Sequence, residues 1–165
     1  MNEEGMFGVR IGNWRRVILC GDYAIKVPAS EDADMAAQAR CLNRWEIEIW
    51  DLWRPRFGWT NLCPVAWGTP DGNVLIMPRT IQDVTETEIR EIESRWFRNA
   101  PYPPPATESK PDDWGRLPSG EVVALDYGYA ATTEAEIKEA RREYEKKWAM
   151  YGPKGIKSPT PPPCP

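Results

Sequence analysis

The sequence contains no histidine, and this absence excludes several classes of enzyme. Without an imidazole, the chain has no Ser-His-Asp or Cys-His nucleophile system, no HExxH zinc site and no histidine that acts as a general base. Cysteine is scarce as well: the four cysteines are dispersed and form no CxxC pair, so neither a zinc knuckle nor a thioredoxin-type motif is expected. Any acid–base chemistry must therefore use carboxylates, lysines, tyrosines or metal-bound water.

Long apolar runs and clusters of basic residues are also missing. No run approaches the roughly 20 apolar residues that span a bilayer, and the N-terminal sequence MNEEGMFGVR has no signal-peptide core. The net charge is −4 and the basic residues are scattered, so nucleic acid is not expected as a partner. These absences predict a cytoplasmic protein without a membrane partner, whose cysteines are reduced and buried as small apolar groups.

Proline and tryptophan, in contrast, are abundant, with 17 and 9 residues in a chain of 165. The length and the 41% of hydrophobic residues predict one domain with a packed core, which we place at residues 1–152. Residues 153–165 are predicted to form a disordered, proline-rich tail, either an unstructured terminus or a ligand for a proline-binding partner. Most tryptophans are expected in the core, notably Trp45, Trp53, Trp96 and Trp148.

Turn signals and apolar periodicity predict an α+β fold in which hairpins and helices alternate. Two strands are expected within residues 11–28, and a second hairpin is expected to join residues 62–67 to residues 74–77. A short buried strand over residues 122–125 follows a proline-rich loop over residues 101–118. Three helices are predicted. The first is a long helix over residues 32–53 that ends before Pro55. The second begins at the Thr85–Glu88 capping box, with Ile89, Ile92 and Trp96 as its apolar stripe, and the third begins at the Thr133–Glu136 capping box.

Two charged residues stand where the pattern requires apolar side chains. Lys26 lies in the middle of an apolar strand, where a lone lysine could equally be a solvent-facing residue. At about 100° per residue, Glu46 falls inside an arc of about 80° that holds the apolar residues of the long helix. Because an unpaired buried carboxylate is costly, we expect Lys26 to pair with Glu46. The apolar residues of this arc are Ala39, Leu42, Ile49 and Trp53.

Asp126 is a third candidate site residue. It directly follows the buried strand 122–125 and precedes Tyr127-Gly128. An aspartate at the carboxyl end of a strand, before a glycine, suits either a metal site or an ordinary turn.

Together these residues resemble the motifs of the protein-kinase fold. Tyr23-Ala24-Ile25-Lys26 is similar to the VAIK strand, Glu46 to the helix glutamate that pairs with its lysine, and Asp126-Tyr127-Gly128 to the DFG motif. The segment 108–113, Glu-Ser-Lys-Pro-Asp-Asp, resembles the catalytic loop D-x-K-P-x-N, and its distance to Asp126 matches the family's spacing. The resemblance covers about residues 8–130 and is greater to short kinase-like proteins of bacteria and phages than to eukaryotic kinases.

The resemblance implies a minimal kinase-like fold, with an antiparallel-sheet N-lobe, one long helix and a strongly truncated C-lobe. It also implies ATP and Mg²⁺ as cofactors. Lys26, held by Glu46, would bind the α- and β-phosphates, and Gly12 in the covering loop and Met77 at the hinge would complete the nucleotide site.

The resemblance implies a catalytic role for Lys110, which would neutralise charge on the transferring phosphoryl group, and a metal-binding role for two aspartates, Asp113 and Asp126. Glu108 would stand at the position of the catalytic base. Phosphoryl transfer depends on positioning and charge neutralisation, so a chain without histidine is compatible with it.

The sequence departs from the kinase pattern at several of these positions. Glu108 replaces an aspartate, which moves the base by one methylene, and Asp113 replaces an asparagine. The covering loop 8–14 has only two glycines, Pro78 has no N–H to offer to adenine, and about 37 residues follow Gly128. A full kinase uses well over a hundred residues there for its substrate platform.

Three hypotheses follow from the sequence. The first is a pseudokinase-type binding or regulatory protein that occupies a host or cognate protein, for example as a phage-encoded inhibitor of a host system, and that retains nucleotide binding or has lost it. The second is an active minimal phosphotransferase that uses ATP and Mg²⁺. The third is an unrelated α+β domain in which Lys26 and Glu46 form a structural ion pair.

Overall fold

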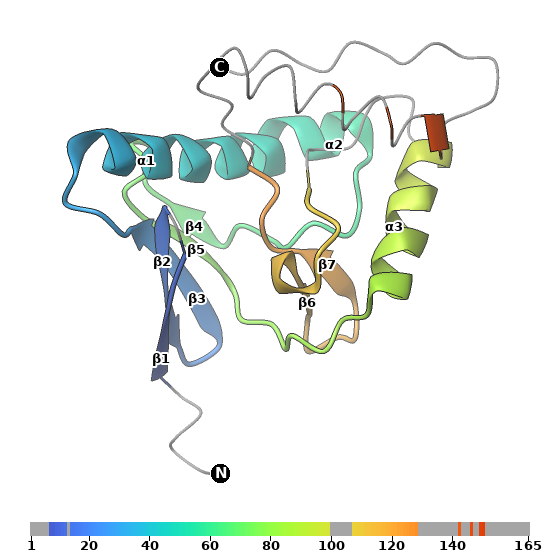
Figure 1. The fold of residues 1–165 in the computed structure, drawn as a ribbon, viewed down its shortest axis with the longest axis horizontal. Coiled ribbons are helices and arrows are strands. Elements are labelled where there is room, and N and C mark those ends of the chain that lie inside the picture. Colours follow the sequence, from blue (N-terminus) through green and yellow to red (C-terminus); the bar gives the residue numbers. More distant parts are fainter. Residues whose placement is uncertain are drawn as a thin grey trace.

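A five-stranded antiparallel sheet and one long helix make up the larger part of the structure (Figure 1). The computed structural model describes residues 7–12, 14–99 and 107–128, together with the helical positions 142, 146, 149 and 150. The α+β class predicted from the sequence is confirmed. The strands lie in the order β1-β2-β3-β5-β4 and are β1 (Phe7–Ile11), β2 (Arg15–Cys20), β3 (Tyr23–Pro28), β4 (Trp67–Gly68) and β5 (Leu75–Pro78).

The β2–β3 hairpin confirms the first predicted pair of strands. Its turn begins at Gly21, whose φ of 55° lies in the left-handed region that favours glycine. The second hairpin is confirmed only in part, because β4 is limited to two residues and residues 63–66 form no strand. Strand β1 was not predicted, since residues 8–12 had been assigned to a loop.

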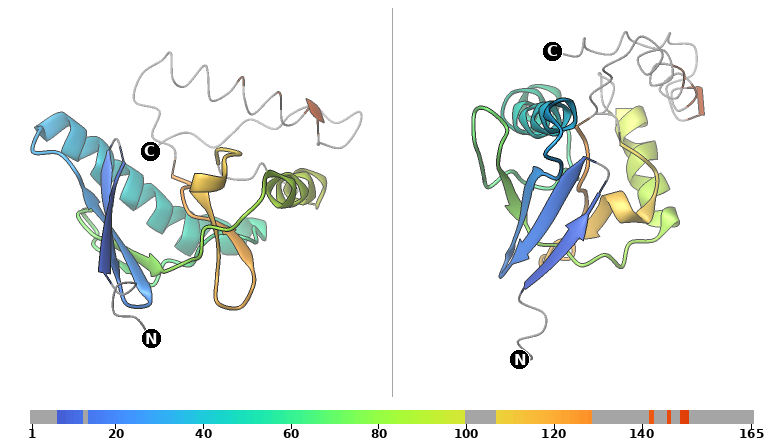
Figure 2. Two further views of the ribbon diagram at one scale, coloured as in Figure 1. Left: turned by 60° about the horizontal axis from the view of Figure 1, so that its bottom comes forward. Right: turned by 60° about the vertical axis from the view of Figure 1, so that its left-hand side comes forward.

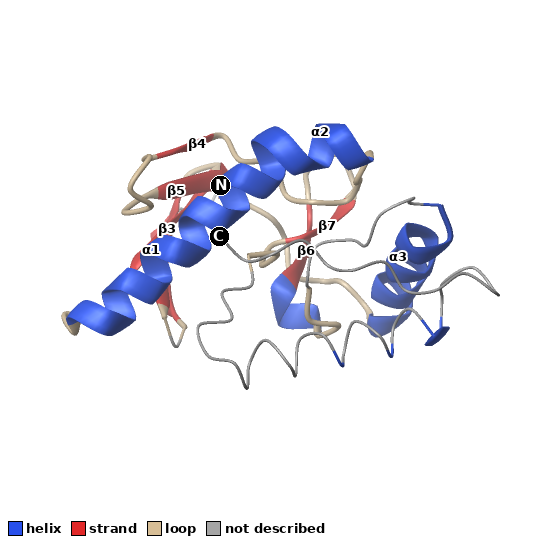
Figure 3. Cartoon of the chain, turned by 90° about the horizontal axis from the view of Figure 1, so that it is seen from above, coloured by secondary structure: helices blue, strands red, loops and turns tan. Residues whose placement is uncertain are grey.

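The long helix α1 (Ala33–Glu48) begins as predicted, but it does not end before Pro55. It continues through a π-helical segment, Ile49–Trp53, into α2 (Arg54–Phe57). Pro55, which has no N–H to donate, lies where the π-helical segment passes into α2. Viewed from above, α1 and α2 follow one another across the molecule (Figure 3).

A second group of elements lies beside the sheet (Figure 2). Helix α3 (Glu86–Asn99) begins with the predicted capping box, in which the Thr85 N–H and hydroxyl donate to Glu88 and the Glu88 N–H donates back to Thr85. The region predicted as loop contains a 3₁₀ turn (Pro111–Asp113) and β6 (Trp114–Arg116), which pairs with β7 (Val122–Ala124). Helix α3 contacts the β6–β7 hairpin through Trp96 and Trp114, whose ring centroids are 5.5 Å apart.

The core lies between these two groups and α1. It includes Trp45 and Trp96, as predicted, with Leu75 and Met77 from the sheet. The side chains of Trp53 and Trp148 and the predicted tail lie outside the described residues, as does most of the predicted helix after Thr133, of which positions 142, 146, 149 and 150 are described and helical. The prediction that the cysteines are buried holds for Cys63 but is wrong for Cys20, which is exposed on β2. None of the described helices is long and apolar enough to cross a membrane.

The sheet face that points away from α1, which we call the outer sheet face, is apolar. According to the strand register, its side chains point to the other side of the sheet from Lys26. Arg16 is its one charged side chain among the described strand residues. Several of its side chains are well exposed, with values of 60% for Val9, 74% for Ile11 and 54% for Trp67. Its apolar residues are Val9, Ile11, Ile18, Cys20, Tyr23, Ile25, Val27, Trp67, Ile76 and Pro78.

The start of α1 provides a test of the fold. The Asp32 carboxylate accepts hydrogen bonds from the N–H groups of Asp34 and Met35, at 3.0 and 2.9 Å. We expect Asp32→Ala to lower the free energy of unfolding by about 1 kcal/mol, because these N–H groups lose their partner. Urea denaturation measures the change, with Glu31→Ala as the matched exposed control; equal effects of the two substitutions would contradict the prediction.

Candidate functional site

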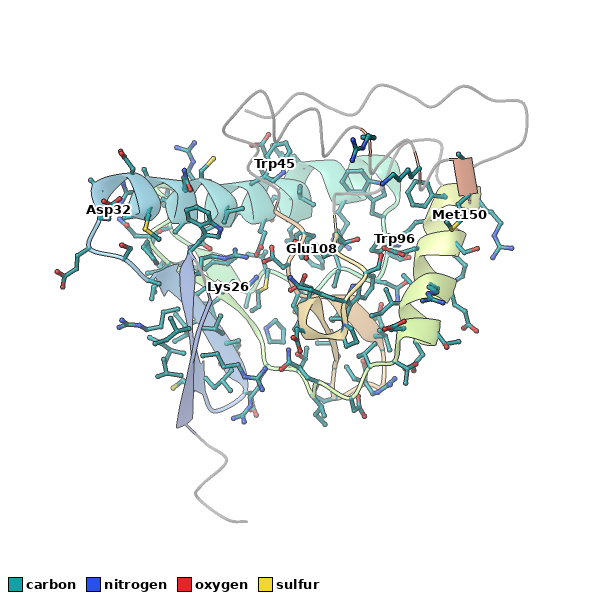
Figure 4. All side chains as sticks on the ribbon, viewed as in Figure 1. Lys26, Asp32, Trp45, Trp96, Glu108 and Met150 are labelled. Atoms are coloured by element: carbon teal, nitrogen blue, oxygen red, sulfur yellow. The ribbon has the colours of Figure 1, made fainter. Side chains whose placement is uncertain are left out.

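The predicted ion pair between Lys26 and Glu46 is present and buried. The Lys26 Nζ atom lies 2.7 Å from Glu46 Oε2, and the two residues are 6% and 0% exposed. Strand β3 places Lys26 on the sheet face that α1 covers, so its interpretation as a solvent-facing residue is wrong. Figure 4 shows Lys26 beneath α1. The Lys26 Nζ atom also donates to the carbonyl oxygen of Leu125, directly before Asp126.

Arg15 is a site residue that the sequence analysis missed. It is 7% exposed, and its two terminal nitrogens bind different carboxylates. Nη1 lies 2.8 Å from Glu46 Oε1, and Nη2 lies 2.9 Å from Asp126 Oδ2. The signal for it was the hairpin register: Arg15 is opposite Pro28, which places it on the same face as Lys26.

Asn43 connects this cluster to the backbone around it. Its Oδ1 atom accepts a hydrogen bond from Arg15 at 3.2 Å, and its Nδ2 atom donates to the carbonyl oxygens of Lys26 and Gly72, at 3.3 and 2.8 Å. The backbone of Gly72 approaches α1 so closely that a Cβ atom there would lie 2.2 Å from the carbonyl oxygen of Arg40. Only glycine fits at this position, which also has a φ of 75°.

The residues after β7 dock against the buried face of α1. Asp126 extends toward Arg15, and Tyr127 is fully buried, with its hydroxyl donating to the carbonyl oxygen of Cys63 at 2.8 Å. A Cβ atom on Gly128 would lie 2.8 Å from Glu46 Cγ, so this glycine also allows a close approach. The three residues Asp126-Tyr127-Gly128 are therefore fixed relative to the ion cluster.

The other candidate residues form a second, more exposed group. Lys110 Nζ lies 2.7 Å from Glu108 Oε2 and 3.2 Å from Asp113 Oδ2. The Glu108 side chain is 69% exposed and the Asp113 side chain 16%. The two groups meet at Leu125, whose N–H donates to the Asp113 carbonyl at 2.7 Å while its own carbonyl accepts from Lys26. The structure thus brings the charged candidates into two adjoining clusters.

Gly12 and Met77 are not part of either cluster. Gly12 is exposed in the β1–β2 connection, and its N–H donates to the Arg15 carbonyl at 2.9 Å. Met77 is 1% exposed in the core.

Burial and neighbouring charges shift the pKa values of three carboxyl groups in the two clusters. Burial raises the pKa of Glu46, and Arg15 and Lys26 act against that shift. For Asp126, burial is outweighed by Arg15 and Lys26, so its pKa is lowered. Burial of Asp113, with Asp126 nearby, raises its pKa to about 6 despite the hydrogen bond from Lys110. The fold therefore favours the protonated form of Asp113 up to a pH of about 6.

Both carboxylates that the resemblance assigns to Mg²⁺ are paired with side-chain cations in this arrangement. Mg²⁺ requires near-octahedral coordination by oxygen atoms. Asp126 Oδ2 is bound by Arg15 and Asp113 Oδ2 by Lys110. The described part of the chain holds no group of three or more histidine, cysteine, aspartate or glutamate side chains placed to bind a metal ion.

Comparisons with known proteins add no assignment. No protein-family model matches the sequence, and no curated protein matches it. Any functional conclusion therefore depends on the motifs and on the geometry described above.

The raised pKa of Asp113 predicts a specific dependence of stability on pH. Because the folded pKa of about 6 lies above the ordinary value of 3.8, the folded state binds the proton more tightly than the unfolded chain. The stabilisation of the folded state by this tighter proton binding is complete below pH 3.8 and is lost as the pH rises through 6. Asp113→Asn cannot ionise, so we expect it to exceed the wild type in unfolding free energy at neutral pH, by up to about 3 kcal/mol.

Urea denaturation between pH 4 and 8 measures this difference. Asp112→Asn is the matched control, because Asp112 is exposed in the same 3₁₀ turn. A pH profile of Asp113→Asn that runs parallel to that of the wild type would refute the assignment.

Proposed function

We propose that the protein is a kinase-like binding and regulatory protein of the pseudokinase type, which acts by occupying a protein partner and not by transferring phosphate. The partner is a host or cognate protein. The observation that carries this proposal is the exposed apolar outer sheet face, considered together with a cluster of candidate catalytic side chains that neutralise one another.

The kinase-like part of the proposal is supported by the relation between Lys26 and Glu46. In protein kinases a lysine on the third strand pairs with a glutamate on the helix that follows, and an aspartate after a later strand faces them. Here Lys26 lies on β3, Glu46 on α1, and Asp126 two residues beyond the end of β7, joined to both through Arg15 and Leu125. An unrelated domain with a structural ion pair has no need of this combination.

Binding is favoured over phosphoryl transfer by the pairing around Lys110. A phosphotransferase would use Lys110 to neutralise the transferring group and Glu108 to accept a proton. These two side chains bind each other at 2.7 Å, and Asp113 takes a second position on the same lysine. The side chains of Lys110 and Glu108, which would act on a substrate, are thus already paired within the protein.

A protein partner is favoured by the outer sheet face. Antiparallel sheets with one solvated face normally carry polar side chains there. Here the polar and charged residues Arg15 and Lys26 lie on the covered face, whereas the exposed face carries Val9, Ile11 and Trp67. Contiguous exposed apolar surface marks interaction sites, and aromatic residues dominate binding energy at interfaces. The partner that fits is a protein with an apolar surface and an acidic residue opposite Arg16.

The second candidate is an active minimal phosphotransferase dependent on ATP and Mg²⁺. The Lys26–Glu46 contact favours it, because active kinases require this pair. The two candidates differ in one measurable property, which is transfer of the γ-phosphate.

The first test is transfer from labelled ATP with Mg²⁺ to the protein itself, to a cell lysate and to small-molecule acceptors. We expect the wild type to give the same background as Asp126→Ala, because Lys110, Glu108 and Asp113 are paired with one another. Calorimetric titration of ATP with Mg²⁺ accompanies the assay. Transfer by the wild type that Asp126→Ala abolishes would establish the enzyme and reject the proposal.

The second test concerns the outer sheet face. The tagged protein is used to capture partners from an extract of its native host. The doubly substituted protein Ile11→Glu with Trp67→Glu is expected to lose a stoichiometric partner that the wild type retains, since two carboxylates interrupt the apolar surface. Leu52→Glu is the matched control, because Leu52 is 62% exposed outside the sheet. Light scattering of the purified protein distinguishes a second copy of the chain from a different partner, and equal capture by all three proteins would exclude this face.

A further inference from the structure

The guanidinium of Arg15 bridges two carboxylates that come from separate parts of the fold. Its Nη1 and Nη2 atoms lie 2.8 and 2.9 Å from oxygens of Glu46 and Asp126, respectively. A planar guanidinium binds carboxylate oxygens through fixed, forked donors, so it sets both distance and direction. A divalent metal ion bridging two carboxylates would impose the same type of constraint.

The charges within this cluster are balanced without any added ion. Arg15 and Lys26 supply two positive charges, and Glu46 and Asp126 supply two negative charges. Three of the four residues are less than one tenth exposed. A divalent cation placed beside Asp126, whose side chain is 45% exposed, would add two positive charges that this neutral cluster does not balance, and it would lie next to the guanidinium of Arg15.

Arg15 is held at both ends, so displacing it would disrupt other contacts. Its backbone is part of β2, opposite Pro28, and its carbonyl accepts a hydrogen bond from the N–H of Gly12. Its guanidinium also donates to Asn43 Oδ1 at 3.2 Å. A metal ion that bound through Asp126 Oδ2 would displace the contact at Nη2, while Glu46 and Asn43 retain the rest of the side chain.

We propose that Arg15 is a resident cation that takes the place of a divalent metal ion at Asp126, so that the site is closed to Mg²⁺ and Mn²⁺ and keeps its arrangement without them. This proposal concerns the same site as the proposed function. It rests on the proposed function only where Asp126 is compared with the metal-binding aspartate of kinases. Arg15 acts as a positioning residue: it directs Asp126 toward α1 and holds the two carboxylates apart.

The test measures thermal unfolding in EDTA and at increasing Mn²⁺ or Mg²⁺, up to about 10 mM, which exceeds the range of weak protein sites for divalent ions. The proteins are the wild type, Arg15→Gln, the double variant Arg15→Gln with Asp126→Asn, and Arg16→Gln. Arg16 is the matched control, because it is the neighbouring arginine and is exposed on the outer sheet face.

We expect the midpoints of the wild type and Arg16→Gln to be unaffected by either metal. Arg15→Gln should unfold several degrees lower in EDTA, because Glu46 and Asp126 lose their shared cation, and should then recover with increasing metal. The double variant should show no recovery, since Asp126 would be the ligand. The proposal would be overturned if metal stabilised the wild type in a saturable way. It would also be overturned if the unfolding midpoint of Arg15→Gln responded to metal no more than that of Arg16→Gln.

A second measurement does not depend on how well Arg15→Gln folds. The EPR signal of free Mn²⁺ is followed while wild-type protein and Asp126→Asn are added. The expected result is that the signal stays that of the free ion with both proteins. Stoichiometric loss of the signal with the wild type, absent with Asp126→Asn, would refute the role of Arg15. A positive phosphotransfer assay would refute the proposed function through a separate readout, so the two failures are distinguishable.

Discussion

The buried carboxylate of Glu46 is the constraint on which the rest of the site depends. A carboxylate with no exposure to water is stable as an anion only when cations and hydrogen-bond donors surround it. Glu46 receives one cation on each oxygen, Lys26 from β3 and Arg15 from β2. This requirement fixes the position of α1 over the inner face of the sheet. It also explains the glycine at position 128, because a Cβ atom there would displace the side chain of Glu46.

The same cluster connects the sheet to the β6–β7 hairpin. The peptide unit of Leu125 lies between the two groups of charges: its carbonyl accepts from Lys26 and its N–H donates to the Asp113 carbonyl. Arg15 adds a second connection through Asp126. A change in either group of charges therefore acts on the other through short contacts, without requiring any movement of α1. The arrangement behaves as one network, in which the effects of paired substitutions are not additive.

Much of this network was predictable from the sequence. The helical arc that contains Glu46 and the apolar strand around Lys26 were sufficient to predict their contact, because a buried anion requires a partner. Arg15 was missed because it stands at the start of a strand, where arginine is usually exposed, and only the register of the β2–β3 hairpin reveals its direction. Strand β1 was missed because the resemblance to kinases assigned residues 8–14 to a loop that covers the nucleotide. The π-helical segment before Pro55 depends on tertiary packing and has no local sequence signal.

The sheet carries apolar side chains on both faces and an ion cluster on the covered one, and this has a physical consequence. The inner face uses part of its area for an ion cluster, and such a cluster contributes less to stability than apolar residues of similar volume. The outer face exposes apolar side chains whose burial the fold does not complete by itself within the described strands. A protein that covered that face would bury apolar surface without having to desolvate more than one charge, that of Arg16. The ion cluster lies on the covered face of the sheet and the exposed apolar surface on the other, so the two proposals concern opposite faces of the same five strands.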